Sequence, residues 1–399
     1  MAFPRSAALA ALSGALVLAS QLPVTASAAA ARTLVIGVDH LDVANQQPQN
    51  GRLFEYTDFF TRDVRIHSGD TLDFRYAPGA FHVVGVAREE DLARKTYPVA
   101  ELDRDDPNAI GSGLKPILLG PSNGPIKNGN ERKGGGQVGT AQDPPFCGVS
   151  SPCTFSGGDD VESTGSGIAT FDQQGNPTTA DWKVTVNAAP GEYDYLCFIH
   201  PGMQGHFTVV DRSNDDVTTQ AQIDSRSAIQ FAADQRKGLD AEQDANVVHF
   251  TGGAPGTRTY DVSVGVGTSD LHVAIDEMLP QHLNIDKGDK VVYHWRDPHN
   301  VHTVGFPAGS PALPGPFAPD IEPGEGFELA TDPGTSAPGT FLTNPNALVD
   351  SGVRFGTAYD VDPSSQVWSV RTNKSTSTAT FAYQCTIHDF MVGTLNVTQ

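Results

Sequence analysis

The chain has 399 residues and a formal net charge of −21 at pH 7, from 26 Lys and Arg against 47 Asp and Glu. This acidic balance excludes nucleic-acid binding, which needs clustered basic side chains. The 41 Gly and 28 Pro, with few long helical patterns, favour an all-β class with extended loops.

Residues 1–30 have the features of a secretory signal peptide. Arg5 supplies a positive charge, residues 8–22 are apolar, and residues 26–28 are a small-residue cleavage site. This run is shorter than the roughly 20 residues that a membrane helix needs, and no later stretch is long enough. We therefore expect export to the periplasm, cell envelope or extracellular space, without a membrane span after cleavage. An uncleaved membrane anchor is the alternative.

A first domain is predicted over residues 31–212. Its apolar strands are interrupted by an insertion, residues 87–180, that is rich in Gly and Pro and is either functional or partly disordered. Cys147 and Cys153 lie in this insertion and are predicted to form a local disulfide. Strands are predicted at residues 33–38, 64–76 (two strands joined by a tight turn), 81–86, 181–187, 192–197 and 206–210.

A linker is predicted over residues 213–245. It is polar and rich in Ala, and Ile229, Ala232 and Ala233 lie at helical spacing. We expect one amphipathic helix that breaks near Gly238.

A second domain, residues 246–399, repeats the first. Residues 283–295 match 64–76, the segment HTVGF at His302 matches HVVGV at His82, and residues 307–377 form a second, shorter insertion. Two copies of a long period indicate a duplicated domain and not a solenoid.

The chemical signature of the chain is a Cys-x2-His-x2-Met loop that occurs twice. Thiolate and thioether groups select Cu(I), and imidazole suits both oxidation states of copper. Each Cys ends an apolar strand at the corresponding place in its domain, which argues for a repeated metal site and against a disulfide between them. The two loops contain Cys197, His200 and Met203, and Cys385, His388 and Met391.

A second histidine is needed to complete each site. In the first domain it is His82. In the second domain, the local sequence PHNV favours His299. The internal repeat favours His302, because Asp70 precedes His82 by 12 residues and Asp289 precedes His302 by 13. We prefer His302, and only one of the two can be the ligand, because their side chains leave a strand on opposite faces.

These loops resemble those of the cupredoxins, most closely the plastocyanin/azurin-like blue copper proteins, and CTIHDFM at Cys385 resembles the amicyanin loop. The resemblance covers both domains apart from the insertions. It implies a Greek-key β-sandwich for each domain, one type 1 copper in each site, hence two per chain, and one-electron transfer with unidentified redox proteins in the cell envelope or outside the cell.

Two other functions use the same ligands. Copper storage or delivery outside the cell favours Met-rich or His-rich tracts, and the chain has four Met in total. A two-domain copper oxidase or nitrite reductase needs a further copper centre, with His next to the Cys and paired His-x-His motifs, and neither occurs. We therefore expect an electron carrier and not an enzyme.

Overall fold

The computed structural model describes residues 30–40, 53–78, 82, 84–87, 118–119, 153–157, 180–197, 200, 202–313, 327–328, 336–356, 366–388 and 390–399. Residues 31–399 form one compact unit. The predicted signal segment up to residue 29, Cys147 and much of both insertions lie outside the described residues. In the described part of the chain, no helix is both long and apolar enough to cross a membrane.

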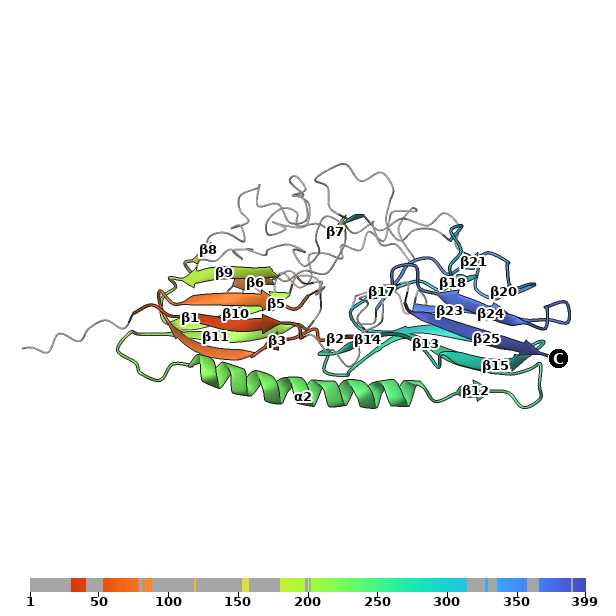
Figure 1. Ribbon diagram of the computed structural model, residues 1–399, viewed down its shortest axis with the longest axis horizontal. Coiled ribbons are helices and arrows are strands. Elements are labelled where there is room, and N and C mark those ends of the chain that lie inside the picture. The colour runs from red at the N-terminus through yellow and green to blue at the C-terminus, as the bar shows by residue number, and fades with distance from the viewer. Residues whose placement is uncertain are drawn as a thin grey trace, which may run out of the picture. The chain divides into compact units, whose positions relative to one another are not determined.

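The first half of the chain forms two sheets around one apolar core, which we call the first sandwich (Figure 1). The strand orders are β3-β1-β5-β9-β8 and β4-β11-β10-β6. The first sheet has two parallel pairs, β1 with β5 and β8 with β9, and the second sheet has one, β4 with β11. The strands are β1 (Thr33–Val38), β3 (Phe59–Phe60), β4 (Asp63–His67), β5 (Thr71–Tyr76), β6 (Val84–Ala87), β8 (Cys153–Phe155), β9 (Ala180–Val186), β10 (Gly191–Cys197) and β11 (Gln204–Val210).

The second half, together with β2 from the first half, forms the second sandwich, in which the same strand order recurs with β2, β12 and β21 added. Its sheets have the orders β2-β14-β13-β16-β23-β20, with β12 on β13, and β15-β25-β24-β18-β21. The parallel pairs recur, as β13 with β16, β23 with β20 and β15 with β25. The strands are β2 (Phe54–Glu55), β12 (His249–Thr251), β13 (Thr259–Gly267), β14 (Ala274–Leu279), β15 (His282–Asp286), β16 (Lys290–Arg296), β18 (Gly305–Phe306), β20 (Thr340–Phe341), β21 (Val349–Asp350), β23 (Val367–Arg371), β24 (Thr380–Gln384) and β25 (Val392–Thr398).

Two short strand pairs lie outside these sheets. The predicted all-β class is confirmed. The pairs are β17 (Val301–His302) with β22 (Arg354–Phe355), and β7 (Leu118–Leu119) with β19 (Phe327–Glu328).

The tight turn of each repeat does not make a hairpin. The strands on either side, β4 and β5, belong to opposite sheets, as do β15 and β16. A buried carboxylate fixes the first turn, since Asp70 accepts the main-chain N–H groups of His67 and Arg32 at 3.0 and 2.9 Å. Asp289 makes the corresponding pair of bonds in the second sandwich. The turn therefore carries the chain from one sheet to the other.

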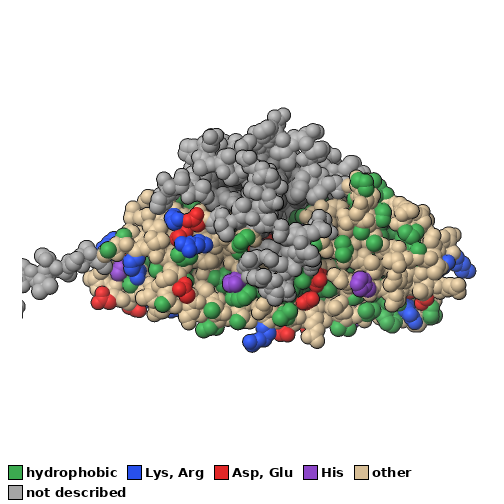
Figure 2. Space-filling model, in the orientation of Figure 1, with side chains coloured by type: hydrophobic (Ala, Val, Ile, Leu, Met, Phe, Trp, Pro, Cys, Tyr) green, Lys and Arg blue, Asp and Glu red, His purple; other side chains and the backbone are tan. Residues whose placement is uncertain are grey.

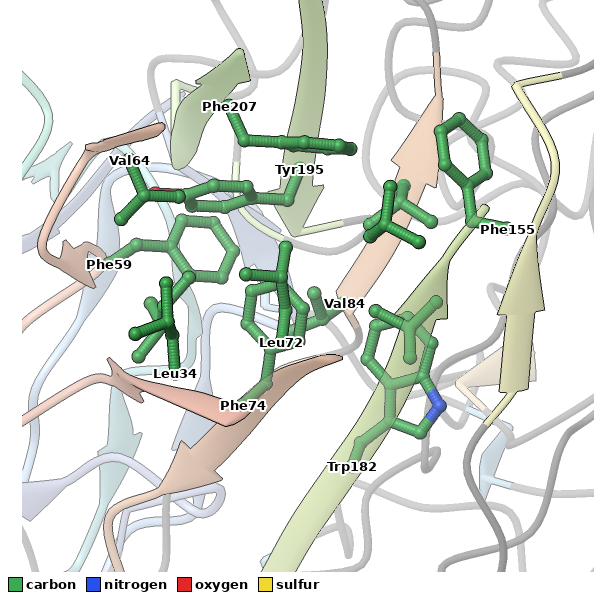
Figure 3. Close-up of a cluster of buried hydrophobic side chains, with 14 of the residues drawn as sticks. Leu34, Phe59, Val64, Leu72, Phe74, Val84, Phe155, Trp182, Tyr195 and Phe207 are labelled. Carbon is green, nitrogen blue, oxygen red and sulfur yellow. The ribbon is translucent and has the colours of Figure 1, made fainter. Parts of the chain in front are cut away.

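Aromatic rings fill the core of the first sandwich (Figure 3). Phe74 on β5 lies 5.3 Å, between ring centroids, from both Trp182 and Tyr195, and Phe59 lies 4.8 Å from Tyr195. Burying one such ring contributes roughly 1.5–3 kcal/mol. Because Tyr195 precedes Cys197 by two residues on the same strand, this packing also fixes the position of the cysteine.

The linker contains helix α2 (Gln220–Ala245), which begins at a capping box. Thr219 accepts the Gln222 N–H at 3.3 Å, and the Gln222 side chain accepts the Thr219 N–H at 2.8 Å, so two orphan donors are satisfied. The helix packs on β1 and β3 of the first sandwich and on β13 and β14 of the second (Figure 1).

The predicted break at Gly238 and the predicted apolar face are both wrong. The helix continues through Gly238, where a Cβ atom would lie 2.9 Å from Phe54 Cε2 and 3.1 Å from Val273 Cγ1. The glycine is therefore a point of close packing. Ile229 is 69% exposed, while Ile223 is among the buried residues of the helix.

A third apolar cluster joins the two sandwiches. It combines Phe54, Tyr56 and Phe60 with side chains of β13, β14 and the segment before β14, and Phe231 of α2 packs against it. Strand β2 lies within the first predicted domain but pairs with β14 of the second sandwich. The sandwiches therefore share both a sheet and a core.

The described surface carries charges of both signs. On the face shown in Figure 2, acidic and basic side chains are scattered among uncharged ones. The net charge of −21 is thus not gathered into one patch on the described part of this face.

Candidate metal centres

His82, Cys197 and His200 converge in the first sandwich, and we call them the first triad. His82 lies just before β6, Cys197 ends β10, and His200 is in the loop that follows. The two Nδ1 atoms are 2.8 Å apart, and Cys197 Sγ is 3.7 Å from His82 Nδ1 and 3.6 Å from His200 Nδ1. All three side chains are buried.

His302, Cys385 and His388 form the second triad. The Nδ1 atoms of the two histidines are 3.1 Å apart, and Cys385 Sγ lies 4.0 Å from His302 and 3.8 Å from His388. His302 and Cys385 are fully buried, whereas the His388 side chain is 21% exposed. The same three donors thus meet in both sandwiches.

His299 lies outside the second triad. Its Nε2 atom is 2.7 Å from the Leu271 carbonyl oxygen, and its ring contacts that of His200 in the first triad. The structure therefore places His302, and not His299, beside Cys385; ligation itself remains a prediction.

Each Cys-His-Met loop is closed by two main-chain hydrogen bonds. The Cys197 N–H donates to the Met203 carbonyl at 2.9 Å, and the Met203 N–H donates to the His200 carbonyl at 3.2 Å. The second loop has the same two bonds at 2.9 and 2.8 Å. Met203 and Met391 are both 1% exposed. The three-residue spacing thus gives a compact loop with buried Cys and Met.

Neither triad cysteine is in a disulfide. Cys153 is disulfide-bonded, and Cys147, the partner predicted for it, lies outside the described residues. The thiols of Cys197 and Cys385 are therefore available for a metal.

The sulfur–nitrogen separations fit a small metal ion, whereas the two Nδ1 atoms of each triad, 2.8 and 3.1 Å apart, lie closer than the same geometry places them. Bonds of about 2.0 Å to nitrogen and about 2.3 Å to sulfur, at about 120°, put nitrogen and sulfur about 3.7 Å apart. The four Sγ–Nδ1 distances lie between 3.6 and 4.0 Å. One ion can therefore contact all three donors of a triad.

The electrostatics of the second triad favour a thiolate. Burial alone raises the pKa of Cys385, but hydrogen bonds from His302 and His388 outweigh it and hold the pKa well below its usual value. Burial lowers the pKa of His388, but Asp276 and Cys385 raise it to about 8. A buried thiolate needs a positive partner, which the imidazoles supply here and a metal ion would supply when bound.

The two imidazoles of the first triad differ in charge preference. Burial lowers the pKa of His82, but its hydrogen bonds to Asp39 and Cys197 raise it to about 10. Burial and the neighbouring His82 hold the pKa of His200 well below its usual value. The lowered pKa favours the neutral imidazole of His200, which is the form that binds metal.

A buried carboxylate orients one histidine of each triad, a feature that the sequence did not reveal. Asp39 Oδ2 lies 3.2 Å from His82 Nε2, and Asp297 Oδ2 lies 3.0 Å from His302 Nε2. All four side chains are fully buried. Such a bond fixes the ring so that Nδ1 faces the metal position.

The two carboxylates do not occupy equivalent positions in the repeat. Asp39 follows β1, whereas Asp297 follows β16, the counterpart of β5. Gly265, at a φ of 65°, leaves space for the second pair, because a Cβ atom there would lie 2.6 Å from both Asp297 Cβ and His302 Nε2. Aligning the repeats could not find this pair, but an Asp directly after a buried strand was a usable signal.

A main-chain amide also contacts the second sulfur. The Thr303 N–H donates to Cys385 Sγ at 3.3 Å, and the neighbouring Trp295 Nε1–H donates to the His302 carbonyl at 3.0 Å. Hydrogen bonds at sulfur stabilise a thiolate and tune the metal that it binds.

A separate group of possible ligands contains Asp58, Asp234 and His272. Arg62 already lies among them, paired with Asp58 and with its Nη2 atom 3.2 Å from Asp234 and 2.8 Å from His272. We interpret this group as an ion-pair network that links the first sandwich, α2 and the second sandwich.

No protein-family model and no curated protein matches the chain. Solved structures do. A methionine-to-alanine mutant of amicyanin with Cu(I) is 18% identical over 37% of this chain and 85% of its own, with a TM-score of 0.19. A reduced tryptophan-to-tyrosine mutant of amicyanin is 17% identical over 38% and 98%, with a TM-score of 0.18. The multicopper oxidase mgLAC is 8% identical over 92% and 86%, also with a TM-score of 0.18.

The fold is cupredoxin-like. The prediction that the chain is not an enzyme is contradicted, because a multicopper oxidase is among the similar structures and spans 92% of this chain. The match concerns the fold alone.

Proposed function

We propose that the chain is a one-electron carrier that binds one copper ion at each triad. The observation that carries the proposal is the repetition, in both sandwiches, of a set of two His Nδ1 atoms and one Cys Sγ atom, of which only His388 is partly exposed. Thiolate, imidazole and thioether together suit copper better than other common metals. The proposed ligands are His82, Cys197, His200 and Met203 in the first site, and His302, Cys385, His388 and Met391 in the second.

Copper would supply the one-electron couple, and the protein would hold its surroundings fixed. The closed loops and the Asp–His bonds keep the donors in place, so little needs to move when the charge changes. Burial keeps water away from both sulfur atoms. The proposal includes export by the N-terminal segment and unidentified redox partner proteins outside the cytoplasm.

The first test is copper content together with the visible spectrum of the oxidised protein. We expect two copper ions per chain and intense thiolate-to-copper absorption. Cys197→Ser and Cys385→Ser should each remove one component of this absorption and leave the other, so each variant is the control for its counterpart.

Other outcomes assign other functions. Copper bound without the visible absorption would contradict electron transfer through these sites and support storage or delivery. Steady consumption of dioxygen with a one-electron donor, lost in both Cys→Ser variants, would make the protein an oxidase.

A further inference from the structure

The loop histidines of the two sites have different surroundings. His388 is 21% exposed on its side chain, and the nearby ring of Phe390, 6.0 Å away, comes from its own loop. His200 is 1% exposed, and its ring lies edge-on to that of His299, with centroids 5.8 Å apart and planes at 85°. His299 belongs to the second sandwich. The first site therefore directs its loop histidine at the other half of the protein.

The loop of the first site packs, at Gly202, on a turn of the second sandwich. Gly202, between His200 and Met203, has a φ of 85°, and a Cβ atom there would lie 2.8 Å from Leu271 Cδ1. The Leu271 carbonyl accepts the Thr57 hydroxyl at 2.9 Å and lies 2.7 Å from His299 Nε2. Contacts from both sandwiches thus hold His299 against His200.

From His299 a short series of hydrogen bonds leads to the second site. Its main-chain N–H donates to Asp297 Oδ1 at 2.8 Å. The other carboxylate oxygen, Oδ2, is 3.0 Å from His302 Nε2, and both side chains are fully buried. Packed or bonded atoms therefore connect His200 to His302.

We infer that the first site exchanges electrons with the second site across the contact between His200 and His299. The inference rests on the proposed function, because it requires a redox-active metal at both sites. In each event one electron moves: the second site is oxidised as the first is reduced, or the reverse, and no bond or proton is transferred. Electrons from an outside one-electron donor enter at the second site, where His388 reaches the surface.

The physical reason is the electronic coupling between the two sites. The rate of electron tunnelling falls steeply with the gap between donor and acceptor, and packed or bonded atoms bridge a gap better than water does. His200 has such a bridge to the second site and little access to solvent.

The kinetic test compares His299→Leu with His299→Phe, which keeps a ring against His200. Both variants must first show both visible bands and unchanged potentials; Cys385→Ser assigns the band of the first site. After rapid injection of one electron per protein, the wild type should show a phase whose rate is independent of protein concentration. We expect His299→Leu to slow this phase and His299→Phe to slow it less.

A second readout needs no copper. In the metal-free protein, diethyl pyrocarbonate should modify His388 and spare His200 and His299, as mapped by mass spectrometry. Modification of His200 as fast as His388 would overturn the inference. So would a concentration-independent kinetic phase that is equally fast in His299→Leu and wild type, or the absence of that phase in the wild type. If both colours are missing, the proposed function fails as well; if they are present without the phase, only this inference fails.

Discussion

His302 and His299 are three residues apart, yet they face different sites. His302 Nδ1 is 4.0 Å from Cys385 Sγ, whereas the His299 ring lies against His200. We therefore expect His302→Ala to abolish the visible band of the second site, with loss of one copper ion. His299→Ala should retain both visible bands and both copper ions. Copper analysis and absorption spectra of the two variants decide between them, and the opposite pattern would make His299 the ligand.

Asp297 and Asp39 permit a matched test of the carboxylate that orients each site. Asp297→Asn removes a buried negative charge next to His302, which destabilises the oxidised, more positive state. The reduction potential of the second site should rise by roughly 50–100 mV, equivalent to about 1–2 kcal/mol for one electron. Asp39→Asn should change only the first site. Equal potentials in Asp297→Asn and wild type would show that the carboxylate has only a structural role.

These residues also show how much of the site could be predicted from sequence. Cys197, His200 and Met203 lie within one loop, so their spacing alone reveals them. His302 could be chosen over His299 because its distance from the Gly-Asp turn, 13 residues, is within one residue of the 12 that separate Asp70 from His82. Asp39 and Asp297 could not be found in this way, because two different strands deliver the same carboxylate to the two sites.

At the scale of elements, helix α2 gives a test of close packing. Gly238→Ala gains about 0.5–1 kcal/mol of helix propensity. The new methyl group, however, would meet Phe54 at 2.9 Å and Val273 at 3.1 Å, and overpacking costs about 1–3 kcal/mol. We expect a net loss of about 1 kcal/mol in the free energy of unfolding by urea. The exposed Asp240→Ala on the same helix should stay within about 0.5 kcal/mol of wild type; a stabilised Gly238→Ala would contradict the tight contact.

Sequence patterns predict where helices and strands occur better than they predict what these elements pack against. Alternation correctly predicted strands on both sides of each Gly-Asp turn, but not that they enter opposite sheets. Helical spacing suggested Ile229 for the buried face, and it is 69% exposed. The partner of a strand or helix is set by contacts distant in the sequence, as in the pairing of β2 with β14.

For the whole molecule, the third apolar cluster decides whether the sandwiches unfold together. It contains seven buried side chains drawn from both halves, and Phe54 is 2% exposed within it. Because separating the sandwiches would expose this cluster to water, we expect wild type to unfold in a single cooperative transition in calorimetry.

Phe54→Ala should weaken this coupling. Truncating a buried Phe costs about 3–5 kcal/mol of stability. Because Phe54 lies in the cluster that joins the two sandwiches, the single unfolding transition should separate into two. Phe155→Ala, the same truncation in the first sandwich's own core, should lower the transition temperature and keep one transition. Two transitions already in wild type would show that the sandwiches fold independently. If Phe54→Ala separates them, it should also slow electron exchange between the sites while both visible bands persist, because His200 and His299 meet only while the sandwiches are joined.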